Sequence, residues 1–136
     1  MKRKALLAAA VFLFAGVSGC AHKTEVQSST ALPAALGEAQ TSLDDNGNTR
    51  VRLVLNHVAP PQNLQPPKNT YVVWVETPDK QMYNLGQLKI DEDRNGKLTG
   101  ITPLKVFRLV VTAEDYGTAQ TPSSQVVLTT KPIEAK

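Results

Sequence analysis

Residues 71–75 read Tyr71-Val72-Val73-Trp74-Val75, and every side chain in this run is apolar. A strand with one face in water alternates apolar and polar residues, whereas a strand buried on both faces is continuously apolar. The run therefore predicts a central strand, with Tyr71, Val73 and Val75 on one face and Val72 and Trp74 on the other. We expect Trp74 to anchor the core.

A strand that is apolar on both faces needs a cover for its outer face. One candidate cover is the neighbouring proline-rich segment Pro60–Pro67, which cannot itself form a regular strand. The alternative is an exposed apolar patch of Tyr71, Val73 and Val75 that binds a partner or a second copy of the chain. The patch predicts that Val73→Lys leaves folding nearly intact and weakens association, whereas loop cover predicts that the fold collapses.

Six further segments have strand character, and tight-turn signals separate several of them. They are residues 36–43, 49–55, 82–91, 97–101, 106–113 and 125–129. The apolar phase slips within 82–91 at Gly86, which predicts a β-bulge. Within 106–113, Phe107 is expected to point inward and Arg108 and Thr112 outward. About seven short strands without a helix favour an all-β fold, an immunoglobulin-like antiparallel β-sandwich.

The N-terminus has the features of an export signal. Residues Lys2–Lys4 are cationic, and the 13 apolar residues Ala5–Val17 follow them. A span of about 20 residues is needed to cross a bilayer, so this run is too short for that and is typical of a signal peptide. Val17-Ser18-Gly19-Cys20 resembles a bacterial lipobox, which implies cleavage between Gly19 and Cys20 and lipidation of Cys20. The alternative is an ordinary signal peptide and a secreted protein.

These features give three expected regions. Residues 1–19 are the lipoprotein signal peptide, residues 20–34 are the lipidated Cys20 and a flexible tether, and residues 35–131 are the β-sandwich domain. We expect a protein anchored in the cell envelope by its lipid, facing the periplasm or the exterior. By resemblance to bacterial lipoprotein sorting, Ala21 in place of Asp favours the outer membrane over the inner one.

Several segments, in their order along the chain, resemble the extracytoplasmic C-terminal domain of anti-sigma-K factors over residues 33–130. They are Tyr71–Val75, Asn84–Gly86, Asp91–Gly96, Val110–Glu114, Pro122 and Val126–Leu128. The chain also resembles small bacterial lipoproteins through residues 33–37, 44–49 and 57–61. The resemblance implies an immunoglobulin-like sandwich outside the cytoplasm. It does not imply sigma-factor inhibition, because this chain has no room for a sigma-binding domain and a membrane-spanning helix.

Charge and cysteine content exclude several classes of function. The chain has 15 Lys and Arg against 12 Asp and Glu, and without Lys2–Lys4 the two counts are equal. A neutral chain lacks the clustered cations that nucleic-acid binding needs, so we expect no nucleic-acid partner. A single cysteine excludes an internal disulfide framework and a Cys-rich zinc site.

The segment Asp91–Gly96 matches the first half of a calcium-binding loop. Asp91, Asp93 and Asn95 stand at loop positions 1, 3 and 5, and glycine follows at position 6. Position 12 is Thr102 instead of the usual bidentate Glu. The other interpretation is an acidic hairpin turn, with Asn95-Gly96 supplying the positive φ angle. Both interpretations remain open at the level of sequence.

No set of residues in the sequence predicts catalysis. His57 is the only histidine of the domain and is expected to be an imidazole at a strand end, while His22 lies in the tether. Ser123 and Ser124 lack a nucleophile-elbow motif. We therefore expect no enzyme and no cofactor. The predicted function is a lipid-anchored interaction or accessory module with a protein partner, and the alternative is a weak calcium-binding envelope module.

Overall fold

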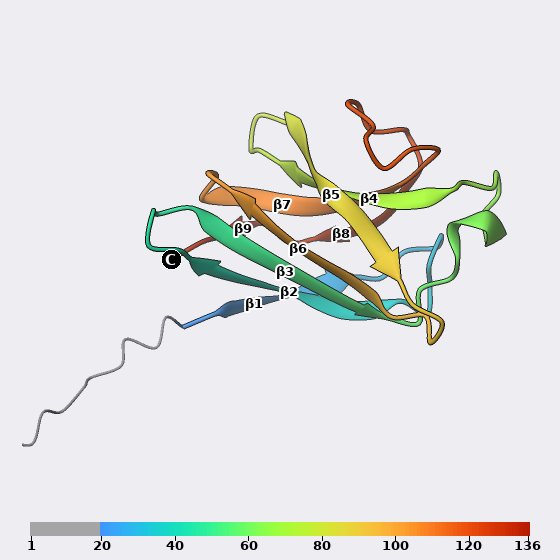
Figure 1. The fold of residues 1–136 in the computed structure, drawn as a ribbon, viewed down its shortest axis with the longest axis horizontal. Coiled ribbons are helices and arrows are strands. Elements are labelled where there is room, and N and C mark those ends of the chain that lie inside the picture. Colours follow the sequence, from blue (N-terminus) through green and yellow to red (C-terminus); the bar gives the residue numbers. More distant parts are fainter. Residues whose placement is uncertain (1–19) are drawn as a thin grey trace, which may run out of the picture.

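The structure is a computed structural model that describes residues 20–136, and it confirms an all-β chain (Figure 1). The predicted signal peptide, including Gly19, lies outside the described residues. The elements are β1 (His22–Gln27), β2 (Leu36–Leu43), β3 (Thr49–Asn56), a 3-10 helix η1 (Pro61–Asn63), β4 (Thr70–Glu76), β5 (Met82–Ile90), β6 (Gly96–Thr102), β7 (Val106–Glu114), β8 (Val126–Thr130) and β9 (Ile133–Glu134).

The strands close into a barrel. Neighbouring strands pair in the order β4-β5-β6-β3-β2-β1-β8-β7, and β7 also pairs with β4, which completes a ring of eight antiparallel strands. The short strand β9 pairs with the beginning of β7. The prediction of an open immunoglobulin-like sandwich of about seven strands is therefore wrong, although each predicted strand is present.

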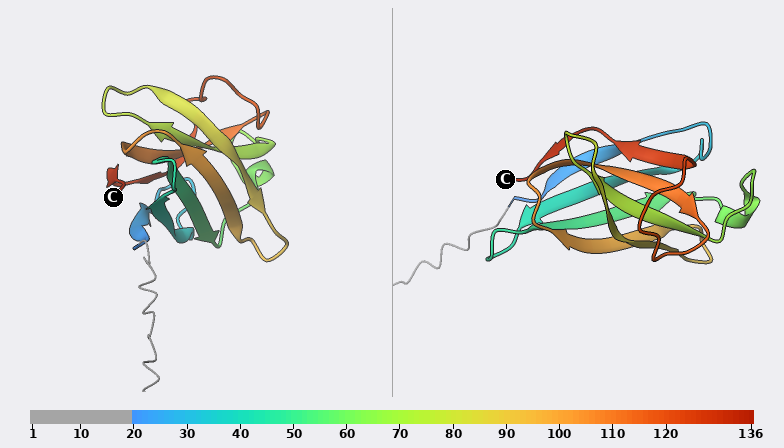
Figure 2. Two further views of the ribbon diagram at one scale, coloured as in Figure 1. Left: turned by 60° about the vertical axis from the view of Figure 1, so that its left-hand side comes forward. Right: turned by 90° about the horizontal axis from the view of Figure 1, so that it is seen from above.

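The ring closes because two strands change partners along their length (Figure 2). Strand β1 pairs with β2 through residues 22–25 and with β8 through Val26 and Gln27. Strand β5 pairs with β4 through residues 82–88 and with β6 through Lys89 and Ile90. Each of these strands joins two sheets that would otherwise be the separate layers of a sandwich.

Strand β1 differs from the flexible tether expected over residues 20–34. Residues 22–27 are polar and weakly patterned, so their local sequence does not predict a strand. They form one because the edges of β2 and β8 offer unpaired backbone groups on either side. Strand formation depends more on such neighbours than on intrinsic propensity. Only Ala21 therefore separates the exposed Cys20 from the first strand of the barrel, which begins at His22.

Strand β4 is buried on both faces, as predicted. Tyr71, Val73 and Val75 point into the main core inside the barrel, together with residues from the surrounding strands. Val72 and Trp74 face outward and pack with Val110 in a second cluster. Neither expected account of the outer face is correct, because the predicted patch residues lie in the core and the cover is not the proline-rich segment.

The cover of the outer cluster is the loop between β7 and β8, which contributes Ala119. Trp74 Nε1 donates to Thr112 Oγ1 at 2.8 Å, and the Thr112 hydroxyl donates to Glu114 Oε1 at 2.5 Å. The backbone N–H of Ser123 donates to the same carboxylate oxygen at 2.7 Å, which fastens the loop. Thr112, predicted to face solvent, is therefore fully buried, because its hydroxyl is satisfied beneath this loop.

The predicted β-bulge is present in β5. Val73 pairs with Gly86 and Trp74 with Asn84, so Leu85 is the extra residue. Gly86 has a φ of 149°, a conformation that favours glycine. The bulge brings Leu85 against β6, where a Cβ atom at Gly100 would lie 2.7 Å from the Leu85 side chain. A Cβ atom at Gly86 would lie 2.9 Å from Leu98, so the two glycines leave room for these leucine side chains between β5 and β6.

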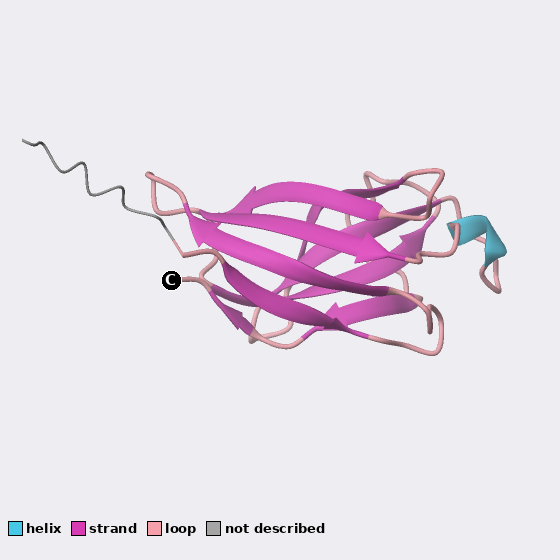
Figure 3. Cartoon of the chain, turned by 90° about the horizontal axis from the view of Figure 1, so that it is seen from below, coloured by secondary structure: helices cyan, strands magenta, loops and turns pink. Residues whose placement is uncertain are grey.

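The turns define two ends of the barrel. The near end is where β1 begins, and it contains the turns at residues 44–48, 77–81 and 103–105 together with the C-terminus. The far end contains residues 28–35, 57–69, 91–95 and 115–125, including η1 (Figure 3). At the far end Pro61 and Leu64 of the proline-rich segment are buried. This segment closes the far end of the core instead of covering β4.

Candidate functional site

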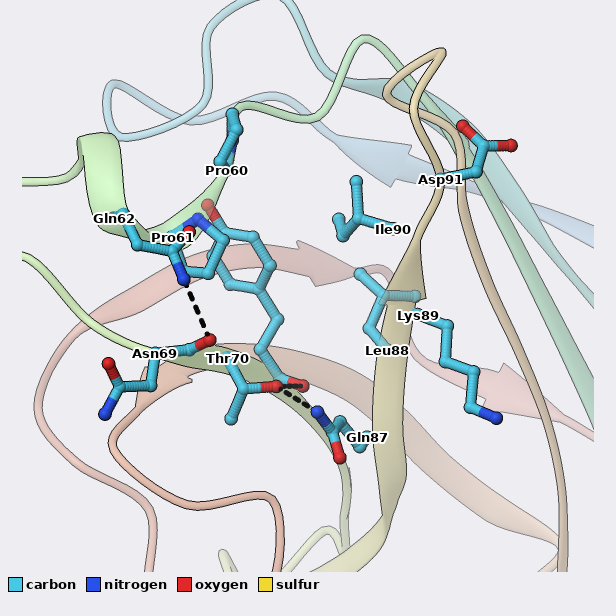
Figure 4. Close-up of a pocket in the computed structure, with 11 residues that line it drawn as sticks. Pro60, Pro61, Gln62, Asn69, Thr70, Gln87, Leu88, Lys89, Ile90 and Asp91 are labelled. Atoms are coloured by element: carbon cyan, nitrogen blue, oxygen red, sulfur yellow. Dashed lines mark hydrogen bonds between the residues drawn. The ribbon is translucent and has the colours of Figure 1, made fainter.

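The change of partner along β1 and β5 leaves gaps in the barrel wall, and these gaps are the main concave surfaces. At the far end β5 leaves β4, and a groove of about 500 Å³ lies between them (Figure 4). It is lined by Pro60, Pro61, Gln62, Asn69, Thr70, Tyr71, Gln87, Leu88, Lys89, Ile90 and Asp91. We refer to this site as the far-end groove.

The polar groups of the far-end groove are held by hydrogen bonds. Gln87 Nε2 donates to Thr70 Oγ1 at 2.7 Å, and Gln62 Nε2 donates to the Asn69 carbonyl oxygen at 3.3 Å (Figure 4). The Tyr71 hydroxyl donates to the Ala59 carbonyl oxygen at 2.7 Å. Burial raises the pKa of Tyr71 to about 12, so this hydroxyl stays protonated at neutral pH.

The groove has the chemistry of a binding surface for a neutral polar ligand. Its amide side chains carry both donors and acceptors, and proline, leucine and isoleucine supply apolar walls between them. The charged groups at its rim are the exposed Lys89 and Asp91, one of each sign. Such a surface suits a polypeptide segment better than a phosphate or a nucleic acid, which needs several cations.

Two further gaps open in the wall, one at the near end and one along β1. The gap between β5 and β6 encloses about 380 Å³ and is lined by Val75, Tyr83, Asn84, Leu85, Ile101, Thr102, Pro103 and Leu104. The gap between β1 and the segment after β8 is about 660 Å³ and is lined by residues 23–28 with Lys131 and Pro132. The first is mainly apolar and the second mainly polar, so the two gaps differ in the ligands that they suit.

Cys20, the predicted lipidation site, is exposed and has no disulfide partner. One residue, Ala21, separates it from β1, and the register of His22 with Thr41 places the start of β1 at the near end. A group attached to the Cys20 sulfur therefore lies outside the barrel at that end. The far-end groove lies at the opposite end of the strands.

The segment Asp91–Gly96 is a tight hairpin turn between β5 and β6. Asp91 Oδ1 accepts from the backbone N–H of Asn95 at 2.8 Å, and Asp91 Oδ2 accepts from Asn95 Nδ2 at 3.3 Å. These bonds, the backbone bond first, hold the pKa of Asp91 below its usual range. The positive φ belongs to Arg94, at 63°, and not to Asn95-Gly96 as expected. Gly96 instead begins β6 in extended conformation and is buried.

In a complete calcium loop, position 12, which is Thr102 here, would approach the turn, and the structure separates the two. Strand β6 runs from Gly96 to Thr102, so these residues lie at opposite ends of the barrel. Thr102 is buried, and its Oγ1 accepts from the Leu104 backbone N–H at 3.3 Å. Within residues 20–136 no three His, Cys, Asp or Glu side chains lie close enough together to hold a metal ion. Calcium binding stays a prediction, and the described residues do not bring a set of such ligands together.

The remaining candidate residues are dispersed. His57 has a φ of 58° and is exposed, so it does not continue the inward face of β3, and Val58 is buried instead. His22 is exposed at the start of β1. Ser123 Oγ donates to the Ala113 carbonyl oxygen at 2.8 Å and helps to hold the loop over Trp74. The structure brings none of these residues to the far-end groove.

One carboxylate outside these sites is largely buried and paired. Glu76, at the near end of β4, accepts from Arg108 Nε at 2.8 Å and from Arg108 Nη2 at 3.2 Å. Lys80 Nζ lies 3.1 Å from the same carboxylate. The hydrogen bond from Arg108 is the main reason that the pKa of Glu76 lies below its usual value. The pair connects β4 to β7 next to the turn at residues 77–81.

The part of the chain that the structure describes has no helix with the length and apolar character needed to cross a membrane. No protein-family model, curated protein or solved structure matches this chain. The resemblance to anti-sigma-K factors therefore stays a prediction.

Proposed function

We propose that this chain is a lipid-anchored, non-catalytic module of the cell envelope that binds a protein partner through its far-end groove. The observation that supports this most directly is the placement of Cys20 and the far-end groove at opposite ends of one barrel. A lipid on Cys20 fixes the near end to a membrane. The same arrangement leaves the groove facing away from that membrane, where a partner has access.

The anchor follows from the lipobox-like Val17–Cys20 and from the exposure of the cysteine. Two or more acyl chains anchor a protein stably, whereas one gives only marginal binding. Modification at Cys20 requires no rearrangement of the barrel, because the residue precedes β1 and its side chain is exposed. The outer membrane is the proposed location, on the basis of Ala21.

A binding role fits the groups in the far-end groove better than catalysis does. The Tyr71 hydroxyl is bonded to a backbone carbonyl and stays protonated. The Asp91 carboxylate is bonded to Asn95 within its own turn. A general base or a nucleophile needs a free lone pair directed at a substrate, and these two oxygens already have intramolecular partners. The amides of Gln62, Asn69 and Gln87 each donate one hydrogen bond within the chain, and their side-chain oxygens accept none from the described residues, so these oxygens can accept from a polypeptide backbone.

The anchor is tested by acyl labelling of the whole chain in its own cells. We expect wild-type protein and a His22→Ala control to incorporate an acyl analogue, and Cys20→Ala to incorporate none. The control changes an exposed residue two positions away and keeps the only thiol. Acyl incorporation into Cys20→Ala would contradict the assignment.

The binding surface is tested by site-specific photocrosslinking in intact cells. A photoreactive residue replaces Gln62 at the far-end groove, and a matched control replaces Thr99, which is exposed on the outer face of β6. We expect a discrete protein adduct from position 62 and none from position 99. The same adducts from both positions, or none from position 62, would count against the groove as the binding site.

A further inference from the structure

Exposed apolar side chains mark the near end of the barrel. Leu43, Tyr83, Ile101 and Val106 are 42%, 50%, 57% and 46% exposed, and each lies within two residues of a near-end turn or strand end. They come from four different strands, so one local sequence feature does not explain them. An apolar rim of this kind is typical of a surface that contacts another apolar phase.

Three of these side chains also border apolar hollows. Tyr83 and Ile101 stand on either side of the gap between β5 and β6, whose floor includes Leu85 and Leu104. Val106 borders a second hollow of about 290 Å³ that Phe107 and Pro132 also line. The other exposed large apolar residues, Leu36, Tyr116 and Val126, are at the far end and border none of the five hollows described by the structure.

The position of the anchor brings this apolar end close to a bilayer. Cys20 is two positions from the first residue of β1, and two extended residues reach at most about 7 Å. A flexible tether over residues 20–34 would let the domain move freely above the membrane. Because β1 already begins at His22, no such tether separates Cys20 from the barrel. The near end is therefore held at the level of the lipid headgroups whenever Cys20 is acylated.

The anchor and the apolar hollow between β5 and β6 lie on opposite walls of the same end. In the ring, β2 and β3 separate β1 from β6 on one side, and β8, β7 and β4 separate β1 from β5 on the other. Contact of both walls with one plane requires the barrel to stand on its near end. An anchored barrel lying on its side would place only one wall against the lipid.

The charges at the near end are mixed. Six exposed basic residues lie there, Lys23, Arg50, Lys80, Lys105, Lys131 and Lys136, against the exposed Asp45, Asp79 and Glu134. Lys23 is paired with Glu38 and Lys80 with Glu76, so the excess of positive charge is small and apolar contact supplies the affinity for zwitterionic lipid. Tyrosine suits such a contact, because its ring enters the apolar boundary while its hydroxyl remains among the headgroups.

We propose that the near end of the barrel inserts Tyr83, Ile101 and Val106 into the headgroup boundary of the membrane, so that the barrel stands upright on the bilayer. This inference depends on the proposed lipid anchor and adds a second, non-covalent contact to it. The bilayer contact fixes the orientation that a single lipid leaves free, and it directs the far-end groove away from the surface.

The single cysteine makes this orientation measurable. When Cys20 is acylated, a second cysteine is the only free thiol, so Ile101→Cys and, as a control, Leu36→Cys each take one fluorophore. The two positions are 57% and 60% exposed, at the near and the far end respectively. The labelled lipoproteins are reconstituted in vesicles of zwitterionic lipid, with and without a headgroup nitroxide quencher.

We expect the label at position 101 to lose most of its fluorescence to the quencher and the label at position 36 to lose little. High salt is expected to leave this difference unchanged, because the contact is apolar. Equal quenching at the two positions, or stronger quenching at position 36, would overturn the upright orientation while leaving the anchor intact. A protein that is not acylated and does not enter the vesicle fraction would overturn the proposed function and this inference together.

A second variant tests the apolar contact without a label. Ile101→Ser in the Cys20→Ser background removes both the lipid and one rim side chain, and Thr99→Ser in the same background is its control. We expect the Thr99→Ser protein to retain weak flotation with zwitterionic vesicles and Ile101→Ser to lose most of it. Circular dichroism confirms folding of both. Equal flotation of the two proteins would overturn the apolar contact.

Discussion

Trp74 shows how one side chain stabilises the barrel from outside. Its ring is fully buried between β4 and the loop of residues 115–125, and its Nε1 donates to Thr112. The ring therefore holds that loop to the wall.

We expect Trp74→Ala to lower the free energy of unfolding by about 3–5 kcal/mol, because it leaves a cavity and a buried hydroxyl with one partner fewer. Trp74→Phe is the matched control, which keeps most of the apolar volume and loses only the hydrogen bond, at a cost of about 1 kcal/mol. Urea unfolding followed by circular dichroism measures both. A urea unfolding curve of Trp74→Ala that matches wild type would show that the Trp74 ring does not stabilise the fold through this loop.

Glu76 gives the chain a pH dependence that can be tested. Arg108 holds the pKa of this carboxyl below its ordinary value, so the folded state binds the proton less readily than the unfolded state does. The stabilisation is therefore complete above the unfolded pKa of about 4.3 and is lost as pH falls through the folded pKa.

We expect Glu76→Gln to cost about 1 kcal/mol at neutral pH, since Arg108 is partly exposed and solvent weakens the pair. The difference from wild type should shrink as pH falls below about 4.3 and approach zero at lower pH. Thermal unfolding measured from neutral pH to below a pH of about 4.3 checks this pH dependence. Asp45→Asn, which removes an exposed carboxylate, is the control. A difference that stays constant with pH would exclude the ion pair as its cause.

At the scale of one element, the two apolar faces of β4 are buried by different parts of the chain. The main core covers the inner face, and the loop between β7 and β8 covers the outer face. Val73 lies inside the barrel and is fully buried, so Val73→Lys places a charge in the main core. We expect this variant not to fold, whereas Thr99→Lys on the exposed face of β6 keeps its fold. Circular dichroism and gel filtration distinguish the two. A folded Val73→Lys protein with weaker self-association would instead support the surface patch predicted from the sequence.

The turn between β5 and β6 is also testable as an element. The Asp91 carboxylate already bonds to Asn95, and Thr102 lies at the other end of β6. We expect calcium at about 1 mM, where weak extracellular sites bind, to leave the melting temperature of the wild-type protein unchanged. Asp91→Ala should lower the melting temperature equally with and without calcium. A rise with calcium in the wild type that Asp91→Ala abolishes would establish the alternative function.

The sequence predicted seven of the nine described strands, the bulge at Gly86 and the two-sided burial of β4, because alternation and glycine report local backbone and burial. It did not predict closure of the barrel. Period-2 patterns show which side chains are buried, but they do not show which strand pairs with which. The polar segment 22–27 becomes a strand only because β2 and β8 meet it. The regular alternation of β7 predicts an outward Thr112, but the loop that directly follows β7 folds back and buries it.

At the scale of the whole molecule, the predicted and the observed sites have different origins. The sequence predicts lipidation at Cys20 from a linear motif, which does not depend on the fold. The far-end groove has no such motif, since Asn69, Thr70, Gln87 and Lys89 meet only where β5 changes partner. The local signals near it are the proline-rich segment, the register break at Gly86 and the turn at Asp91, and they predict a loop, a bulge and a turn without predicting that these border one groove.

Closure through β1 also constrains the order of biosynthesis. Val26 pairs with Thr130, so the wall joins a residue near the start of the chain to one near its end. Under the proposed export from the N-terminus, Cys20 would be presented for modification while β8 is still on the other side of the membrane. Until β8 arrives, β1 and β7 each expose an unpaired edge that invites aggregation. If the chain is exported as proposed, it would need protection during export until its last strands emerge.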